Sequence, residues 1–187
     1  MSASVQGPSG HRAETCLAAG IRPDAVIGDL DSISAEARSV FAEVLHPVTE
    51  QVTTDFEKCL MRIEAPLVLA VGFTGGRVDH LLAVLNVLAR YADRRIVLLG
   101  TDDVSVIVPD SMTMALAAGE RISLLPLSET ICSTTGLRWD LTDAALAPHA
   151  AISISNAAAA PTQCISATGL LLCSVPRRNL NALLAAL

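Results

Sequence analysis

Two aspartates, Asp29 and Asp31, follow a short apolar run in the stretch VIGDLDSIS at residues 26–34. One acid here would suit the cap of a following helix. Two carboxylates at alternate positions repel one another unless a cation lies between them. Such oxygen ligands suit magnesium, which binds one or two carboxylates together with substrate phosphates. The spacing therefore favours a cation site where a buried strand ends.

Two further loops have the same position relative to a strand and a helix. TTD at 53–55 and TGGRVDH at 74–80 each open a helix-like segment. The carboxyl ends of parallel strands share one edge of a sheet, where open α/β sheets bind ligands. Gly75 and Gly76 allow the backbone to approach an anion at a helix N-terminus, and Arg77 adds a forked donor for phosphate oxygens. The acids predicted at this edge are Asp29, Asp31, Asp55 and Asp79. Together these features predict a magnesium-polyphosphate site.

Each of these residues also has a more ordinary structural interpretation. Asp31 can start a turn, Asp55 suits the first turn of its helix, and Asp79 can be an N-cap. The Gly75–Gly76 pair can be a tight turn, and His80 is more typical of a structural hydrogen-bonding residue than of a base. Three such loops at one edge favour the functional interpretation. The sequence contains no GxxxxGK[ST] motif, so a Walker-type nucleotide site is not expected.

The elements that would position these loops alternate along the first half of the chain. Helix-like segments are expected at 11–19, 34–45, 54–65 and 80–92, and strand-like segments at 25–28, 44–48, 66–73 and 95–100. Thr54 and Glu57 have capping-box spacing at the start of the third helix. The alternation predicts a mainly parallel sheet with helices on both faces.

The second half has a different pattern. From about residue 104 the segments are short, strand-like and separated by turn residues, and helical periodicity returns only at 179–187. This pattern is typical of a β-sandwich or barrel. The predicted architecture is an α/β domain at 1–108 followed by an all-β sandwich domain at 109–187.

The bulk composition excludes several classes of protein. A net charge of −6 without a basic stripe argues against a nucleic-acid binder. The apolar runs are shorter than the ~18 residues that span a membrane, and we expect neither a membrane partner nor a signal peptide. The five cysteines are scattered and lack CxxC spacing. This usage fits reduced thiols, so a cytoplasmic location is expected.

Four segments, in their order and spacing, resemble the thiamine pyrophosphokinase family. They are PDAVIGDLDSIS at 23–34, TTDFEKCL at 53–60, GGRVDHLLAVLNVL at 75–88 and STTGLRWDLTDAALAPHAAISISN at 133–156. The resemblance implies an α/β domain followed by a β-sandwich, and a homodimer with active sites at the subunit interface. It implies ATP and thiamine as substrates and Mg²⁺ as the cofactor. The reaction would transfer the pyrophosphoryl group of ATP to the thiamine hydroxyl, giving thiamine diphosphate and AMP.

The resemblance also implies roles for individual residues. The magnesium ligands would be Asp29, Asp31 and Asp55, which with Asp79 form the expected catalytic set. The ATP and phosphate contacts would be Gln51, Thr54, Gly75, Gly76, Arg77 and Asp79. The thiamine contacts would be Ser133, Trp139, Ser155 and Asn156. An indole face suits the cationic aromatic thiamine, although Trp139 as core filler is the alternative. Its polar neighbours Arg138 and Asp140 favour an exposed ring.

The sequence departs from the family pattern at two places. An ADGGA loop, which contributes to the family's nucleotide site, has no counterpart before Gly10 and His11. Val52 follows Gln51 where the family commonly has an acid before the TD pair. Two alternatives therefore stay open. One is a magnesium-dependent kinase for another small alcohol, and the other is a catalytically silent protein that binds thiamine or a nucleotide.

Overall fold

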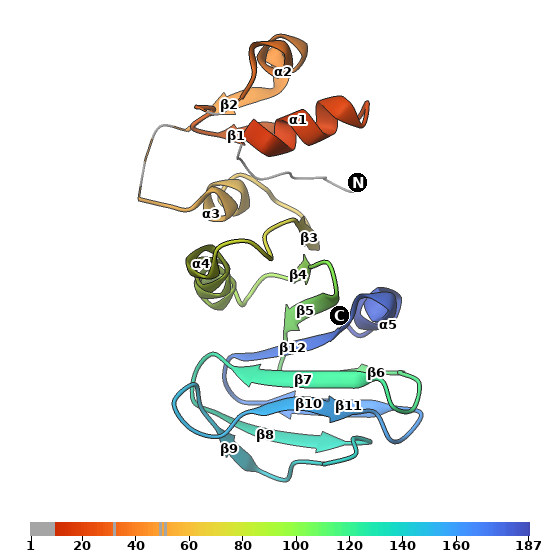
Figure 1. Cartoon of the computed structure of the whole chain (residues 1–187). Coiled ribbons are helices and arrows are strands. Elements are labelled where there is room, and N and C mark those ends of the chain that lie inside the picture. Colours follow the sequence, from red (N-terminus) through yellow and green to blue (C-terminus); the bar gives the residue numbers. More distant parts are fainter. Residues whose placement is uncertain (1–9, 32, 49, 51) are drawn as a thin grey trace.

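The computed structural model describes residues 10–31, 33–48, 50 and 52–187 (Figure 1). The elements of the first half are α1 (Gly10–Ala18), β1 (Val26–Gly28), α2 (Ala35–Val40), the 3₁₀ turn η1 (Ala42–Val44), β2 (Leu45–Pro47), α3 (Asp55–Leu60), β3 (Val68–Val71), α4 (Val78–Arg90) and β4 (Ile96–Leu99). The second half contains β5 (Asp103–Ile107), β6 (Ser111–Met114), β7 (Arg121–Pro126), β8 (Thr130–Thr135), β9 (Ala144–Leu146), β10 (Ser153–Ala157), β11 (Gln163–Ala167), β12 (Leu171–Pro176), η2 (Arg177–Asn179) and α5 (Leu180–Ala185). The alternating first half and strand-rich second half follow the predicted order.

Within the described residues, the strands form three sheets. β1 and β2 are a separate parallel pair. The largest sheet has the order β10-β7-β12-β5-β4-β3, in which only β3 and β4 are parallel. The third sheet, β6-β11-β8-β9, is antiparallel and faces the largest one to form the sandwich at the bottom of Figure 1.

The predicted single, mainly parallel sheet is therefore not confirmed. After β4 the chain reverses within residues 100–102, so that β5 returns antiparallel and pairs Val104 with Leu99. The β4 edge that a further parallel strand would need is thus occupied by β5. As a result, the largest sheet runs across residue 108, the predicted domain boundary, which stays a prediction.

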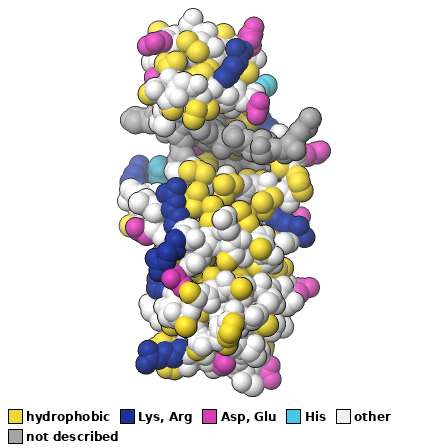
Figure 2. Space-filling view, turned by 90° about the vertical axis from the view of Figure 1, so that its right-hand side faces the viewer, with side chains coloured by type: hydrophobic (Ala, Val, Ile, Leu, Met, Phe, Trp, Pro, Cys, Tyr) yellow, Lys and Arg dark blue, Asp and Glu magenta, His cyan; other side chains and the backbone are white. Residues whose placement is uncertain are grey.

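The helices α3 and α4 both cover the same face of the β3–β4 pair. Phe56 and Leu60 of α3 and Val84, Val87 and Leu88 of α4 form one core with Val68, Ala70, Ile96 and Leu98. On the opposite face, Val97 and Leu99 of β4 join the sandwich core. Leu69 and Val71 of β3 are exposed there. Figure 2 shows hydrophobic side chains gathered across the middle of the side that faces right in Figure 1.

A smaller core connects the β1–β2 pair to α3. Ile27 of β1 packs with Val48 and Cys59. The helix α3 ends earlier than its sequence pattern predicts, because Arg94 donates to the carbonyls of Leu60 and Ile63 at 2.6 and 2.7 Å. The helix α3 therefore lies between the β1–β2 pair and the β3–β4 pair, and contacts both.

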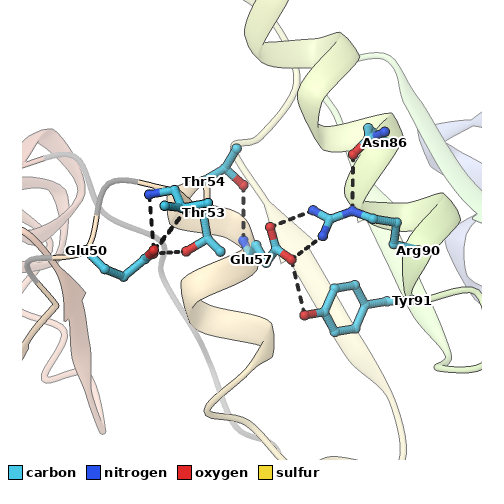
Figure 3. Close-up of polar contacts among 8 residues, drawn as sticks. Glu50, Thr53, Thr54, Glu57, Asn86, Arg90 and Tyr91 are labelled. Carbon is cyan, nitrogen blue, oxygen red and sulfur yellow. Dashed lines mark hydrogen bonds and ion pairs between the residues drawn. The ribbon is translucent and has the colours of Figure 1, made fainter.

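The charged side chains of Glu57 and Arg90 join α3 to α4 (Figure 3). Thr54 caps α3 as predicted and accepts a hydrogen bond from the Glu57 N–H at 3.3 Å. The Glu57 carboxylate does not complete the capping box. The residue Glu57 is 5% exposed. Its carboxylate accepts two hydrogen bonds from Arg90, both at 2.5 Å, and a third from Tyr91 Oη at 3.4 Å. Buried charges of this kind need such partners, so the pair fixes how the two helices meet.

No helix in the described part of the chain is long and apolar enough to cross a membrane.

We expect Glu57→Gln to lower the free energy of unfolding by about 2 kcal/mol, because it replaces two charge-assisted hydrogen bonds with weaker ones. Chemical denaturation followed by circular dichroism measures this change. Glu64→Gln is the matched control, since Glu64 is exposed on the segment that follows α3. Equal stability of the two variants would contradict a structural role for the Glu57–Arg90 pair.

Candidate functional site

The loop after β1 presents two carboxylates around one buried residue. Leu30 is 7% exposed and has a φ of 60°, a left-handed conformation that a branched side chain rarely adopts. Arg38 holds this conformation by donating to the Leu30 carbonyl at 2.9 Å. The Asp31 N–H donates to Asp29 Oδ1 at 3.2 Å. The buried leucine thus anchors a turn from which a half-buried Asp29 and an exposed Asp31 are available to a ligand.

Asp55, the first residue of α3, lies within the electrostatic reach of two other loops. Burial raises the pKa of its carboxyl group above the ordinary value, and the negative charge of Asp29 raises it further. Lys58 and His80 act in the opposite direction. The side chain of Asp55 is still 42% exposed. The loop after β1 and the start of α4 therefore lie near enough to the start of α3 for their charges to act on Asp55.

Arg77 and Asp79 lie at the beginning of α4. Arg77 donates two hydrogen bonds to the Asp79 carboxylate, at 3.0 and 2.5 Å, and both side chains are exposed. The hydrogen bond from Arg77 lowers the pKa of Asp79. Asp79 is not the N-cap, because Arg77 holds that position and Asp79 accepts instead from the His80 N–H at 3.0 Å. The guanidinium group is thus held in a fixed orientation beside open solvent.

The two glycines before Arg77 are required by the backbone. Gly75 and Gly76 have φ values of 94° and 71°, and a Cβ atom at either position would meet no atom within 4 Å. Left-handed geometry rather than close packing therefore explains glycine here. The open space around both residues leaves the N-terminus of α4 accessible.

The predicted metal ligands are brought together only in part. Asp29 and Asp55 interact, and Asp31 is linked to Asp29 through its backbone. Within the residues that the structure describes, no three His, Cys, Asp or Glu side chains are close enough to form a complete metal site. Two hard oxygen donors that repel one another fit magnesium, which takes waters and phosphate oxygens as its other ligands. The metal set stays a prediction, and Gln51 lies outside the described residues.

The predicted thiamine residues of the sandwich fall into two places. Trp139, in the loop between β8 and β9, is 56% exposed, with the Arg138 guanidinium 4.8 Å from its ring centroid. An exposed ring rules out the core-filler alternative. Asn156 is only 3% exposed. Its Nδ2 donates to the Trp139 carbonyl at 2.7 Å, and its Oδ1 accepts from the Trp139 N–H at 3.2 Å.

Asn156 therefore holds the backbone of Trp139, and its contact with thiamine stays a prediction. Its neighbour Ser155 is exposed and has a φ of 59°, at an irregularity in the pairing of β10 with β7. The Ser155 N–H donates to Ser123 Oγ at 3.0 Å. Strained backbone of this kind is often found at functional sites.

Ser133 lies elsewhere on the sandwich. Its hydroxyl accepts from the Asp143 N–H at 2.9 Å and donates to Asp143 Oδ1 at 3.0 Å. It lines a shallow hollow of about 320 Å³ together with Asp110, Ser166 and Thr168. Trp139 does not line this hollow, so the structure does not group Ser133 with the tryptophan.

Three charged residues near the site were not predicted as functional, namely Glu57, Lys58 and Arg90. Glu57 was interpreted only as part of a capping box. Lys58 is 2% exposed and lies one turn after Asp55. The pattern FEKCL contained a signal for Glu57 and Lys58. Adjacent charges that are flanked by apolar residues on a short helix must either be buried with charged partners or face solvent.

Two family models match this chain in succession. One describes the catalytic domain of thiamin pyrophosphokinase and matches residues 11–99, and the other describes its vitamin B1 binding domain and matches residues 108–172. The chain belongs to the thiamin pyrophosphokinase family. The first model contains the Asp29, Asp55 and Arg77 loops, and the second contains Trp139.

Individual members of the thiamin pyrophosphokinase family agree with this assignment. Thiamine pyrophosphokinase 1 of Oryza sativa subsp. japonica is 32% identical over 178 residues, which cover 84% of this chain and 67% of that protein. Thiamine pyrophosphokinase 1 of Arabidopsis thaliana is 33% identical over 155 residues, covering 72% of this chain and 58% of that protein. The chain thus spans about three fifths to two thirds of the length of these relatives.

Solved structures of thiamin pyrophosphokinases share the fold. The structure from Geobacillus thermodenitrificans superposes with a TM-score of 0.75 at 30% identity and covers 88% of this chain and 81% of that one. The structure from Candida albicans has a TM-score of 0.75 at 15% identity, covering 90% and 78% of the two chains, and supports the fold alone.

We expect Asn156→Ala to loosen the Trp139 loop, because it removes the two side-chain hydrogen bonds that hold the backbone of Trp139. The free energy that stabilises this loop should fall by about 1–2 kcal/mol. Trp139 is the only tryptophan of the chain, so its fluorescence reports on the loop directly. Its emission should shift to longer wavelength, and acrylamide should quench it more strongly. Asn181→Ala, at an exposed position in α5, is the control. Unchanged emission and quenching in Asn156→Ala would contradict the clamp.

Proposed function

We propose that this chain transfers the pyrophosphoryl group of ATP to the hydroxyl of thiamine, giving thiamine diphosphate and AMP. The observation that carries the proposal is that the charges of Asp29 and His80 both act on Asp55, in a chain whose two halves match the catalytic and vitamin B1 binding domains of the family. The exposed Trp139 supplies the second half of the argument, because a flat aromatic face suits the cationic rings of thiamine.

Mg²⁺ is the proposed cofactor, and Asp29, Asp31 and Asp55 would hold it. When bound, it would neutralise charge on the polyphosphate. Pyrophosphoryl transfer otherwise needs positioning and charge stabilisation rather than covalent help from the protein. Arg77 is oriented by Asp79 and offers the remaining donors of its guanidinium group to phosphate oxygens. Asp79 belongs to the proposed catalytic set through this contact.

The N-terminus of α4 adds a second anchor for the nucleotide. Gly75 and Gly76 leave the space before this helix open, and the first amide groups of a helix favour anions. The Thr54 hydroxyl already accepts from Glu57 at the start of α3, so it would act there chiefly by fixing the position of Asp55.

A homodimer with shared active sites is part of the proposal. The loop between β8 and β9, which contains Trp139, lies at the opposite end of the molecule in Figure 1 from the β1–β2 pair, whose first strand ends directly before Asp29. A second copy would supply the missing half of each site. The exposed Leu69 and Val71 of β3 support a protein partner.

The proposed compartment is the cytoplasm. Cys132, Cys164 and Cys173 are free thiols in the structure. Free thiols on strands of both sheets of a sandwich are typical of proteins in reducing surroundings.

Incubation with ATP, Mg²⁺ and thiamine should produce AMP and thiamine diphosphate in equal amounts, which chromatography measures. Asp31→Ala should reduce this turnover at least ~100-fold, because even residues that only support metal ligands contribute about 10–100-fold. Its circular dichroism spectrum should not change. Asp93→Ala, at an exposed position after α4, is the matched control.

Other results of this assay would select the alternatives. Turnover with a different small alcohol but not with thiamine would assign another acceptor. Thiamine binding without turnover would indicate a silent binding protein, and full activity of Asp31→Ala would refute its role at the metal.

Trp139→Ala should raise the KM for thiamine about tenfold and change kcat little, because the stacking contact is lost while the phosphate site is intact. Trp139→Phe retains an aromatic face and should lie between the wild type and the alanine variant. Initial rates at varied thiamine concentration measure both constants. A KM for thiamine that is unchanged in Trp139→Ala would remove the ring from the site.

A further inference from the structure

Lys58 is a buried cation within the acidic site. Its side chain is only 3% exposed, and its Nζ lies 3.7 Å from Asp55 Oδ1. The neighbouring Glu57 is committed to Arg90 through two hydrogen bonds of 2.5 Å. An ammonium group is strongly disfavoured inside a protein unless an anion balances it, so the position of Lys58 needs an explanation.

The contact between Lys58 and Asp55 is loose. A charge-assisted hydrogen bond between an ammonium and a carboxylate is normally about 2.7–2.9 Å long, whereas this N–O distance is 3.7 Å. The side chain of Asp55 is 42% exposed, in contrast to the buried lysine. A ligand can therefore reach the carboxylate from solvent while the ammonium group stays where it is.

The charges around this contact indicate how it responds to a ligand. Asp55 lies near the negative charge of Asp29, and Lys58 is the cation beside it. A divalent cation held by the two aspartates would be repelled by the fixed ammonium group a few ångströms away. A polyphosphate that arrives with the cation would remove this repulsion, because its oxygens can contact both positive charges.

We propose that Lys58 exchanges partners, holding Asp55 in the ligand-free protein and contacting a phosphate oxygen of ATP once a divalent cation occupies the carboxylate. This inference rests on the proposed function, since it needs a metal-nucleotide complex at this site. Lys58 would then make binding of the metal depend on binding of the nucleotide. It would disfavour the metal alone and favour the metal together with a polyphosphate.

The experiment compares two affinities in Lys58→Met, made in the full chain. The first is for Mn²⁺ alone, measured from the electron paramagnetic resonance signal of the free ion. The second is for α,β-methylene-ATP in the presence of saturating Mn²⁺, measured by calorimetry. We expect Mn²⁺ alone to bind about tenfold more tightly or better, and the nucleotide analogue to bind about tenfold more weakly or worse.

The controls separate this role from a structural one. Lys58→Arg keeps the charge and should move both affinities back toward the wild type. Arg95→Met removes one positive charge at an exposed position before β4 and should change neither affinity by more than about twofold. Thermal unfolding checks that Lys58→Met is folded, and Lys58→Gln replaces it if it is not.

The sign of the two changes decides the outcome. A loss of both affinities in Lys58→Met, or no change in either, would overturn the proposal. If opposite changes are found but the wild type does not transfer the pyrophosphoryl group to thiamine, the inference on Lys58 stands and the assignment of the acceptor fails. If the wild type binds neither Mn²⁺ nor the nucleotide analogue, both proposals are wrong.

Discussion

The orientation of α3 relative to α4 depends on the ion pair between the buried Glu57 and the half-exposed Arg90. α3 contributes Asp55 and Lys58 to the candidate site, while α4 begins at the Arg77–Asp79 pair. Apolar packing alone leaves two helices some freedom to slide, whereas the carboxylate of Glu57, whose side chain is 7% exposed, must keep its partners. Together with the apolar core that the two helices share, this contact places the acidic half of the site relative to the arginine that would bind phosphate.

Charge is balanced differently at the two ends of this site. At the start of α4 the Arg77–Asp79 pair is exposed and bidentate, so water screens it and its main effect is to orient the guanidinium group. At α3 the Lys58 ammonium is buried, and its partner Asp55 is in part exposed. The first pair is preorganised for an anion, whereas the second can change when a cation binds. A site for a metal-bound polyphosphate needs both properties.

The sequence predicted local structure better than strand pairing. α4 covers Val78–Arg90 where the apolar periodicity predicted 80–92, because the repeat of a helix is contained in the helix itself. The splitting of the expected parallel sheet was not predictable in this way, since it follows from β5 pairing back onto β4. Similarly, the residue types indicated an acidic site, but the partners of Glu57 and Lys58 depend on how α3 is rotated. Asn156 was expected to contact thiamine, yet its burial reveals a clamp on Trp139.

The two halves of the candidate site are stabilised by separate interactions. Asn156 holds Trp139 through backbone hydrogen bonds within the sandwich, and Glu57 holds α3 through Arg90 in the other half. The described structure shows no hydrogen bond or ion pair that links these two networks directly. Energetic effects at sites without shared partners are generally additive. Cooperation between the tryptophan and the acidic loops must therefore arise from a shared ligand or from a second copy of the chain that brings the two surfaces together.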